Sequence, residues 1–556
     1  MRPTRMPLHP LIRQRSAPLP SLVQPPIATR TMALASALAL AFIAMPPAGG
    51  QTSERQRTNS AKPPGKVTRL ESDALPRGAA QLLERLKIPS SAVAVVVRHP
   101  ATGHDRLAIQ SDRPSNPASI IKLLTTYAAL EQLGPSWTWR TPVWLAGPVN
   151  GQAPSAILDG HLHIKGSGDP KLHTERLWSL LQKVRALGIS EIHGDIVLDQ
   201  SAFAEPREQA ADFDGEPLKP YNVQARALML NQRTLTYGFV PDSPQGVARI
   251  TAEPPLTGVR VDATVPLAPG PCHDWRADLK AQLQDPARVR FLGRYPAACG
   301  ERHWHVAYSD PASYDRRMLE AMWTGMGGRL TGRVREGPAP VGTPPSFEWA
   351  SPPLADVVRD INRYSNNTMA QMLALTLAAQ QAPPGTTVGG EQARRWLQEW
   401  AQSRLGGSKG KAGNDVGTPS ASDEEARRSP IIENGSGLSR EQRISAHQVA
   451  MLLQIAWKSP VLPEFIGSLP VTGAADGTLR RWQHLAGQAH LKTGSLRDVV
   501  GVAGYVLGRS GQRWIVVVMI QHERAQEARA ALDALVQWAI DDGPAALRAS
   551  PQTASP

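Results

Sequence analysis

Three short motifs, far apart but in a fixed order, constrain this chain more than any other feature. The sequence S-I-I-K starts at Ser119, S-N-N starts at Ser365 and K-T-G starts at Lys492. Each motif alone is a weak signal, whereas the ordered set S-x-x-K, S-x-N, K-T-G is typical of enzymes with a serine nucleophile. A fold that uses all three must bring both ends of the chain to one cleft.

The first motif suits a serine that carries its own base. The run that follows Pro117 and stops at Gly134 predicts a helix with Ser119 in its first turn, and residues three apart share a helix face. Lys122 then lies beside the hydroxyl. It can remove the serine proton only if burial or a second cation, such as Lys492, lowers its pKa. The alternative is an ordinary helix with a surface lysine.

The second motif is predicted to link two helices. The segments 354–363 and 369–379 have apolar residues at helical spacing, and the polar residues between them can reach a cleft. Ser365 is expected to relay a proton to the leaving group, and Asn367 to bind a substrate amide. The alternative is a plain inter-helix turn.

Two strand patterns follow the third motif. The segments 499–507 and 514–521 are apolar, and the polar stretch 508–512 between them contains glycine, so a β-hairpin is predicted. A strand before this hairpin would carry Lys492 and Thr493 at the edge of the sheet. The alternative is an exposed lysine before a turn.

The residues of this third segment suit the binding of a carboxylate and an oxyanion. The charge of Lys492 and the hydroxyl of Thr493 match a substrate carboxylate, and Gly494 would leave room for substrate backbone. The main-chain N–H groups of Ser119 and Ser495 are expected to form an oxyanion hole.

With these motifs the chain resembles the low-molecular-mass class C penicillin-binding proteins, the periplasmic D-alanyl-D-alanine carboxypeptidases and endopeptidases. The stretch K-G-S-G-D-P from Lys165 resembles the glycine-rich segment of that family, and D-G-T-L from Asp476 resembles the stretch before K-T-G. The stretch N-G-S-G-L-S-R resembles the family's D-G-S-G-L-S-R loop, but Asn434 replaces the usual aspartate. The likeness runs from about residue 75 to about residue 540.

The resemblance implies an α/β fold of the penicillin-binding and β-lactamase-like transpeptidase type, in which helices flank an antiparallel sheet. It implies an acyl-enzyme on Ser119, peptidoglycan stem peptides as substrates, acylation by β-lactam antibiotics such as penicillins, and no cofactor. A β-lactamase with the same catalytic set and a catalytically silent wall-binding scaffold remain alternatives. The interval between Ser119 and Ser365 is longer than the one between the corresponding motifs of class A β-lactamases. In the penicillin-binding family that this chain resembles, extra domains fill this interval.

Composition and pattern predict a division of the chain into six segments. We expect a signal peptide (1–48), a disordered leader (49–69), two parts of the catalytic domain (70–138 and 345–541), an inserted β-rich region between them (139–344) and a flexible tail (542–556). A further disordered loop, rich in Gly, Ser and charged residues, is expected at about 406–430. Helices are also predicted over 76–86, 445–457 and 524–540, and a second hairpin over 92–98 and 106–110.

The amino-terminal segment and the overall charge bear on the location and partners of the protein. Residues 32–45 form an apolar run that has the length of a signal-peptide core and is short for a membrane span, which predicts export to the periplasm. The net charge of +13 is scattered, so it would permit peripheral association with anionic wall polymers or membranes. No arginine-rich segment with interleaved aromatic residues occurs, so nucleic acid is not an expected partner.

The two cysteines and the histidines are the candidates for a disulfide bond and for metal ligands. In an oxidising compartment Cys272 and Cys299 are expected to form a disulfide, and two separate thiols are the alternative. No Cys and His set has zinc-ligand spacing, so no metal site is predicted. His161 and His163 alternate along a predicted strand, where they would either face solvent or reach one ion.

Overall fold

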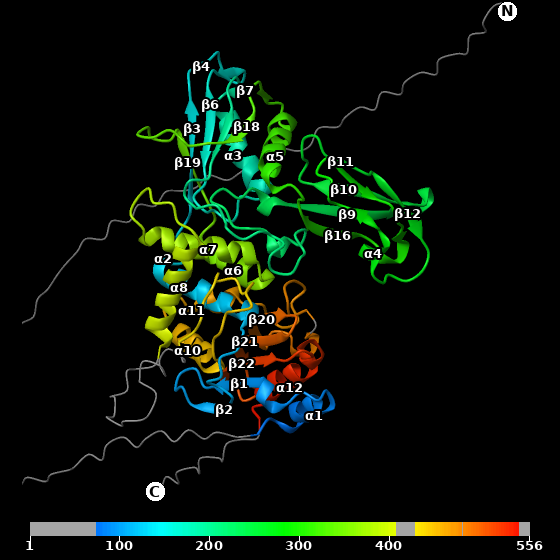
Figure 1. Cartoon of the computed structure of the whole chain (residues 1–556), viewed down its shortest axis with the longest axis vertical. Helices are drawn as coiled ribbons and strands as arrows, with labels where there is room; N and C mark the ends of the chain where they lie inside the picture. Colours follow the sequence, from blue (N-terminus) through cyan, green and yellow to red (C-terminus); the bar gives the residue numbers. More distant parts are fainter. Residues whose placement is uncertain (1–73, 407–428, 481, 544–556) are drawn as a thin grey trace, which may run out of the picture. The chain divides into compact units, whose positions relative to one another are not determined.

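The computed structural model describes residues 74–406, 429–480 and 482–543. The predicted signal peptide and leader, and most of the predicted loop at 406–430 and of the tail at 542–556, lie outside these residues. The described part of the chain contains five β-sheets and the helices that cover them (Figure 1).

A five-stranded antiparallel sheet is built from both ends of the chain, as the motif order requires. Its strand order is β2-β1-β22-β21-β20, so in Figure 1 the blue β1 lies beside the orange-red β22. The strands are β1 (Val93–Arg98), β2 (Asp105–Ile109), β20 (Ala489–Leu496), β21 (Val499–Leu507) and β22 (Arg513–Gln521). Both predicted hairpins are therefore present, and β20 forms a sheet edge as expected.

The strands of this sheet are apolar throughout because both faces are covered. In β1, Ala94 and Val96 belong to one hydrophobic core, whereas Val93, Val95 and Val97 belong to another. Successive side chains of a strand point to opposite faces, so one apolar run supplies two cores. This confirms the predicted α/β arrangement of a sheet with helices on both faces.

The helices of the catalytic part fall into two groups. The first and last helices, α1 and α12, contribute to the core on one face, and the others contribute to the core on the opposite face. They are α1 (Arg77–Arg85), α2 (Lys122–Leu133), α6 (Leu354–Tyr364), α7 (Asn367–Gln381), α8 (Gly390–Leu405), α10 (Ala446–Trp457), α11 (Leu462–Ser468) and α12 (Arg529–Ile540). The predicted helix at 524–540 is a 3-10 turn, η8 (Ala525–Ala528), followed by α12.

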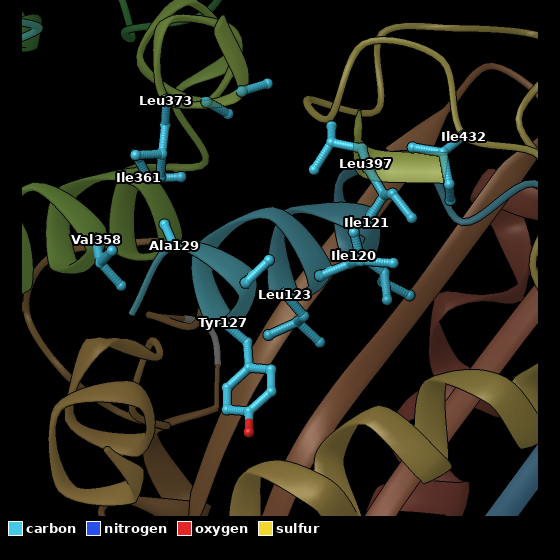
Figure 2. Packing of buried hydrophobic residues seen from close by; sticks show 14 of the residues in the cluster. Ile120, Ile121, Leu123, Tyr127, Ala129, Val358, Ile361, Leu373, Leu397 and Ile432 are labelled. Atoms are coloured by element: carbon cyan, nitrogen blue, oxygen red, sulfur yellow. The ribbon is translucent and has the colours of Figure 1, made fainter. Parts of the chain in front are cut away.

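Helix α2 lies at the centre of the larger core. Every residue from Lys122 to Leu130 is buried, so the helix is enclosed on all sides rather than amphipathic. Figure 2 shows Ala129 of α2 together with side chains of α6, α7 and α8, including Val358, Leu373 and Leu397, whereas Tyr127 points away from these three; all belong to one hydrophobic core. A helix held in this way gives the residues at its amino terminus a fixed position.

The inserted region contains four further sheets. Two of them have the orders β18-β8-β6-β3-β19 and β17-β7-β5-β4. Their strands are β3 (Arg140–Ala146), β4 (Val149–Asn150), β5 (Ala156–Leu158), β6 (His161–Lys165), β7 (Ile189–Ile192), β8 (Ile196–Asp199), β17 (Arg329–Leu330), β18 (Val334–Glu336) and β19 (Phe347–Ala350). Because β19 pairs with β3, the first sheet extends beyond the predicted boundary at residue 344.

The other two sheets occupy the middle of the insertion. Their orders are β15-β12-β10-β9-β16 and β11-β14-β13. The strands are β9 (Thr234–Asp242), β10 (Val247–Glu253), β11 (Arg260–Val261), β12 (Thr264–Ala268), β13 (Ala281–Gln282), β14 (Arg288–Phe291), β15 (Tyr295–Pro296) and β16 (Arg302–Ala307). Besides η8, the described residues form the short 3-10 turns η1 (Ser90–Ala92), η2 (Ala118–Ile121), η3 (Pro220–Asn222), η4 (Asn231–Arg233), η5 (Ser243–Gln245), η6 (Ala297–Cys299) and η7 (Gln483–Leu485).

The insertion also contains helices that the prediction of a β-rich region omitted. These are α3 (Thr174–Ala186), α4 (Trp275–Asp278) and α5 (Pro311–Gly325). Helix α3 buries Leu177, Leu180, Leu181 and Val184, which have helical spacing, so the signal was present in the sequence. The short strands on both sides of α3 led to the prediction of a β-rich region, so the helical spacing of these leucines was overlooked.

The disulfide predicted from the sequence is present. Cys272 and Cys299 are bonded. Cys299 belongs to the hydrophobic core of the insertion and Cys272 packs against it, and in this core Phe239 packs against both Trp275 and Tyr295. The bond therefore links two segments that flank one aromatic cluster.

Replacing both cysteines with alanine should lower the free energy of unfolding by about 2–4 kcal/mol, because the unfolded chain regains the freedom that the cross-link removed. Urea unfolding followed by tryptophan fluorescence, with reduced wild-type protein as a second sample, measures the change. An unchanged midpoint would show that the disulfide does not stabilise the insertion.

Candidate active site

The nucleophile candidate lies on a tight turn that leads into α2. Ser119 is the second residue of η2, a 3-10 turn that continues directly into α2 at Lys122. Ser119 therefore lies in the first turn of the helical segment, as predicted, although this turn is 3-10 rather than α-helical. The Asn116 side chain holds the turn by accepting a hydrogen bond from the N–H of Ala118 at 2.9 Å. The predicted proximity is present, because Lys122 Nζ lies 3.0 Å from Ser119 Oγ.

Lys122 is fully buried among hydrogen-bond acceptors. Its ammonium group donates to Ser119 Oγ, to Asn367 Oδ1 at 2.6 Å and to the carbonyl oxygen of Ser436. Burial lowers the pKa of Lys122 well below its usual value, and the nearby charge of Lys492 lowers the pKa further. A neutral amine at this position can accept the proton of the serine hydroxyl.

Lys492 is the second buried cation, as the sequence suggested. It lies on β20, donates to Ser365 Oγ at 2.8 Å and to the carbonyl oxygen of Thr493 at 2.9 Å, and has no exposed surface. Burial lowers the pKa of Lys492 to about 7. The contact that the sequence suggests between Lys492 and a substrate carboxylate stays a prediction.

The S-x-N motif joins α6 to α7 through only two residues, which is shorter than the predicted link. Ser365 ends α6 in the left-handed conformation (φ 57°), and Asn366 caps α7 by accepting a hydrogen bond from the N–H of Met369 at 2.9 Å. Asn367 is already the first residue of α7. The two-residue junction directs Ser365 toward Lys492 and Asn367 toward Lys122, so each motif residue contacts one lysine.

The insertion takes part in holding this junction. The Asn367 amide donates to the carbonyl oxygen of Tyr221 at 3.2 Å, and Thr368 Oγ1 donates to that of Val223 at 3.0 Å. Asn366 Nδ2 donates to Gln232 Oε1 at 2.9 Å. The backbone of the insertion therefore fixes the orientation of the Asn367 side chain.

The glycine-rich loop after α8 supplies a further acceptor. Asn434 Oδ1 accepts from the N–H of Ser436 at 3.0 Å, and Asn434 Nδ2 donates to the carbonyl oxygen of Leu438 at 2.8 Å. An asparagine thus makes both bonds that shape the loop, whereas an aspartate could only accept. A side chain at Gly437 would place its Cβ 2.2 Å from the Ala118 carbonyl oxygen, so the loop packs directly on the nucleophile turn.

Strand β20 is equally close to the nucleophile turn. A Cβ at Gly494 would lie 2.6 Å from the Pro117 carbonyl oxygen, so the room that was expected for substrate backbone is occupied by the protein itself. The N–H of Leu491 points away from β21, since it donates to the Pro470 carbonyl oxygen. Residues two apart along a strand share this direction, so the N–H of Ser495 points to the same free edge, as an oxyanion hole with Ser119 requires.

Thr493 and Ser495 project their side chains to the face opposite Lys492. Ser495 Oγ accepts a hydrogen bond from Arg529 of α12 at 3.1 Å, which places it on the α12 side of the sheet. Both residues line a cavity there, together with Thr478 and Arg529.

Other predicted features contribute nothing to this site. His161 and His163 lie with ring centroids 6.0 Å apart on β6, and in the described chain no three metal-binding side chains gather at one point. Within residues 74–406, 429–480 and 482–543, every helix is too short or too polar to cross a membrane.

The sequence reasoning missed two contributors to the site. Ser436 and Tyr221 both accept hydrogen bonds through their main-chain carbonyl oxygens. Every residue has such a carbonyl group, so the residue type does not indicate which one is used. The glycines on both sides of Ser436 were the available signal, since they indicate backbone packed closely against another segment.

The buried ammonium of Lys492 should make the protein more stable as the pH rises. The pKa of Lys492 is about 7 in the folded state and about 10.4 for a free lysine, so the unfolded chain binds more protons between these values and the free energy of unfolding increases with pH. Lys492→Met should therefore gain stability relative to wild type at pH 7 and below, and this advantage should shrink as pH approaches 10.

Urea unfolding at three pH values between 6.5 and 10 measures this difference. Lys458→Met, at an exposed lysine that follows α10, is the control and should show a constant difference from wild type. A constant difference for Lys492→Met as well would contradict a strongly lowered pKa.

Comparison with known proteins agrees with the geometry. The family model described as D-Ala-D-Ala carboxypeptidase 3 (S13) matches residues 78–401 and 426–541. A D-alanyl-D-alanine carboxypeptidase of Actinomadura sp. (strain R39) is 26% identical over 462 residues, which cover 79% of this chain and 80% of the relative. The D-alanyl-D-alanine carboxypeptidase DacB of Haemophilus influenzae is 22% identical over 411 residues, 72% of this chain and 80% of the relative.

A solved structure shares the fold. The crystal structure of penicillin binding protein 4 from Haemophilus influenzae superposes with a TM-score of 0.61 at 20% identity, over 83% of this chain and 98% of that one. The family match spans most of the chain and includes all three motifs. The chain therefore belongs to the D-Ala-D-Ala carboxypeptidase 3 (S13) family of low-molecular-mass penicillin-binding proteins.

Proposed function

We propose that this protein is a periplasmic serine-type D-alanyl-D-alanine carboxypeptidase and endopeptidase that acts on peptidoglycan stem peptides and is acylated by penicillins. The observation that carries the proposal is the pair of Ser119 Oγ and Lys122 Nζ, 3.0 Å apart, with the pKa of the lysine lowered by burial. Family membership supports the choice of D-alanyl-D-alanine as the substrate class.

In the acylation step Lys122 is the base. Its neutral amine takes the proton of Ser119, and Ser119 Oγ attacks the carbonyl carbon of the penultimate D-alanine. The positive charge of Lys492 keeps Lys122 unprotonated before the reaction, since two ammonium groups repel each other in a buried site. The oxyanion that forms accepts hydrogen bonds from the N–H groups of Ser119 and Ser495.

The second step needs a proton on the leaving amine. Ser365, hydrogen-bonded to Lys492, passes a proton to the nitrogen of the terminal D-alanine, so the C–N bond breaks and the acyl-enzyme remains on Ser119. Asn367 has its Oδ1 on Lys122 and is assigned a second role in binding the substrate amide. Water then attacks the ester carbonyl and gives a proton to the Ser365–Lys492 pair, and Lys122 returns its proton to Ser119 Oγ as the ester C–O bond breaks.

The other parts of the proposal rest on the sequence. The apolar run at 32–45 supports export to the periplasm, where stem peptides occur, and the net charge of +13 supports contact with anionic wall polymers. The β-lactamase alternative needs a carboxylate or equivalent base for fast deacylation. In the described chain the partners of Lys122 are a hydroxyl, an amide oxygen and a carbonyl oxygen, and none is a carboxylate.

Ser119→Ala should abolish covalent labelling by a penicillin while the protein remains folded. Loss of one hydroxyl in η2 costs little stability but removes the attacking atom. Intact-mass measurement after incubation with benzylpenicillin tests this, with Ser179→Ala, a serine on α3, as the control. Addition of one penicillin to Ser119→Ala would refute the assignment. In wild type, stable labelling indicates a penicillin-binding protein, and rapid loss of the label with turnover indicates a β-lactamase.

Lys122→Ala should slow acylation by about 10²–10⁴-fold, because the serine loses its base. Stopped-flow measurement of the acylation rate with a chromogenic cephalosporin gives the effect directly. A melting temperature within a few degrees of wild type shows that the variant is folded. An acylation rate close to that of wild type would exclude Lys122 as the base.

A further inference from the structure

The loop before β20 carries a carboxylate that contacts the two residues immediately before Ser365. Asp476 forms an ion pair with Arg363 and accepts a hydrogen bond from the Tyr364 hydroxyl at 3.3 Å. Arg363 and Tyr364 are the last two residues of α6, and Ser365 follows as its cap. The mechanism above uses Ser365 but none of the other three side chains, so their contacts remain to be explained.

The backbone of Ser365 has a conformation that is unusual for a serine. Its φ is 57°, in the left-handed region that residues with a Cβ rarely adopt. Such a conformation costs free energy and persists only where the surrounding structure maintains it. The direction of the hydroxyl depends on this conformation, and in it Ser365 Oγ lies 2.8 Å from Lys492 Nζ.

The loop packs directly against the end of α6. Gly477 has a φ of 79°, and a Cβ added to it would lie 3.2 Å from the Arg363 carbonyl oxygen. A residue with a side chain would therefore have a strained backbone and would crowd the helix. Glycine at this position allows the loop to approach α6 closely enough for Asp476 to contact Arg363 and Tyr364.

The same loop is attached to the strand that carries Lys492. At the start of the loop, the Pro470 carbonyl oxygen accepts a hydrogen bond from the N–H of Leu491 at 2.9 Å. Leu491 belongs to β20 and directly precedes Lys492, and the far end of the loop continues into β20. Asp476 therefore connects α6 to a loop that is already held on β20 at both of its ends.

These contacts form a closed ring between α6 and β20. Lys492 on β20 donates to Ser365 at the end of α6, and the two residues before Ser365 bind Asp476, whose loop returns to β20. Two elements that are joined at two points cannot slide past each other without breaking one of the contacts. The contacts of Asp476 therefore limit the movement of Ser365 relative to Lys492.

The ion pair contributes to position more than to stability. Hydrogen bonding from Arg363 holds the pKa of Asp476 below its usual value, so the pair is charged at neutral pH. The side chains of Arg363 and Asp476 are 31% and 45% exposed, so water screens their attraction, and a pair of this kind adds little to the free energy of unfolding. Variants that lack the pair are therefore expected to fold.

We propose that Asp476 is a positioning residue that acts through Arg363 and Tyr364 to hold the Ser365 hydroxyl between Lys492 and the leaving nitrogen. The inference rests on the proposed function, since it deepens the role that Ser365 has there. Ser365 can pass on a proton only if its hydroxyl lies within hydrogen-bond distance of both the lysine and the nitrogen. The attack by Ser119 does not use this proton, so loss of Asp476 should slow the reaction only where the leaving atom needs protonation.

Two substrates separate these steps. They are N,N′-diacetyl-L-lysyl-D-alanyl-D-alanine and its thioester analogue, in which sulfur replaces the nitrogen of the terminal D-alanine. The amine leaves only after it receives a proton, whereas a thiolate leaves without one. The ratio kcat/KM is measured for both, because it reports the steps up to the acyl-enzyme. Spontaneous hydrolysis of the thioester is subtracted with Ser119→Ala.

Asp476→Ala should lose about tenfold in kcat/KM on the amide, a part of the roughly 10²–10⁴-fold that a positioned proton donor contributes, and should match wild type on the thioester. Arg363→Met should behave in the same way. The double variant should be no slower than either single variant, because both changes remove one interaction. The control is Arg359→Gln, which breaks an exposed ion pair with Asp356 on the same helix and should match wild type on both substrates.

The pattern of losses decides the inference. A loss confined to the amide in both Asp476→Ala and Arg363→Met supports it. A loss on the thioester as large as that on the amide shows a general structural defect and overturns it, and so does the absence of a loss on the amide; in both cases the proposed function stands. If wild type hydrolyses neither the amide nor the thioester, the proposed function is overturned and the inference with it.

Discussion

The burial of two lysine side chains in one cleft is the constraint on which the rest of the site depends. Lys122 and Lys492 are both without exposed surface, and each is surrounded by oxygen atoms that accept hydrogen bonds. Removing a charged amine from water is costly, so burial lowers the pKa of both. The same cost that makes the cleft unfavourable for folding keeps the Lys122 amine unprotonated, so that it can take the proton of Ser119.

The architecture can be understood as a means of enclosing those two amines. Helix α2 is buried on every side, the edge strand β20 approaches the nucleophile turn closely enough to require glycine at Gly494, and the loop with Gly437 closes a second side. The carbonyl groups that receive the Asn367 and Thr368 side chains come from the insertion. Four parts of the chain that are distant in sequence therefore enclose a site of only a few residues.

The elements with a strong local pattern were predicted with near-correct boundaries. Strand β21 covers the predicted 499–507, α10 follows the cap at Ser445, and α6 exceeds the predicted helix by one residue. In each case apolar spacing, a capping side chain or a turn sequence determines the ends locally. Helix α3 was missed although its leucines have helical spacing, because the surrounding strands are only two to five residues long and carry weak signals.

The sequence by itself determined the chemistry: a serine with a lysine three residues later, a second lysine and a polar junction, in an order that identifies the family. Residue type and spacing suffice for this, because a nucleophile and its base are neighbours on one turn. Only the tertiary structure decided which group each side chain meets. The Ser436 and Tyr221 carbonyl groups, the enclosure of Lys492 and the side of the sheet on which Arg529 meets Ser495 all depend on segments distant in sequence. Burial and main-chain acceptors are properties of packing, and no single residue encodes them.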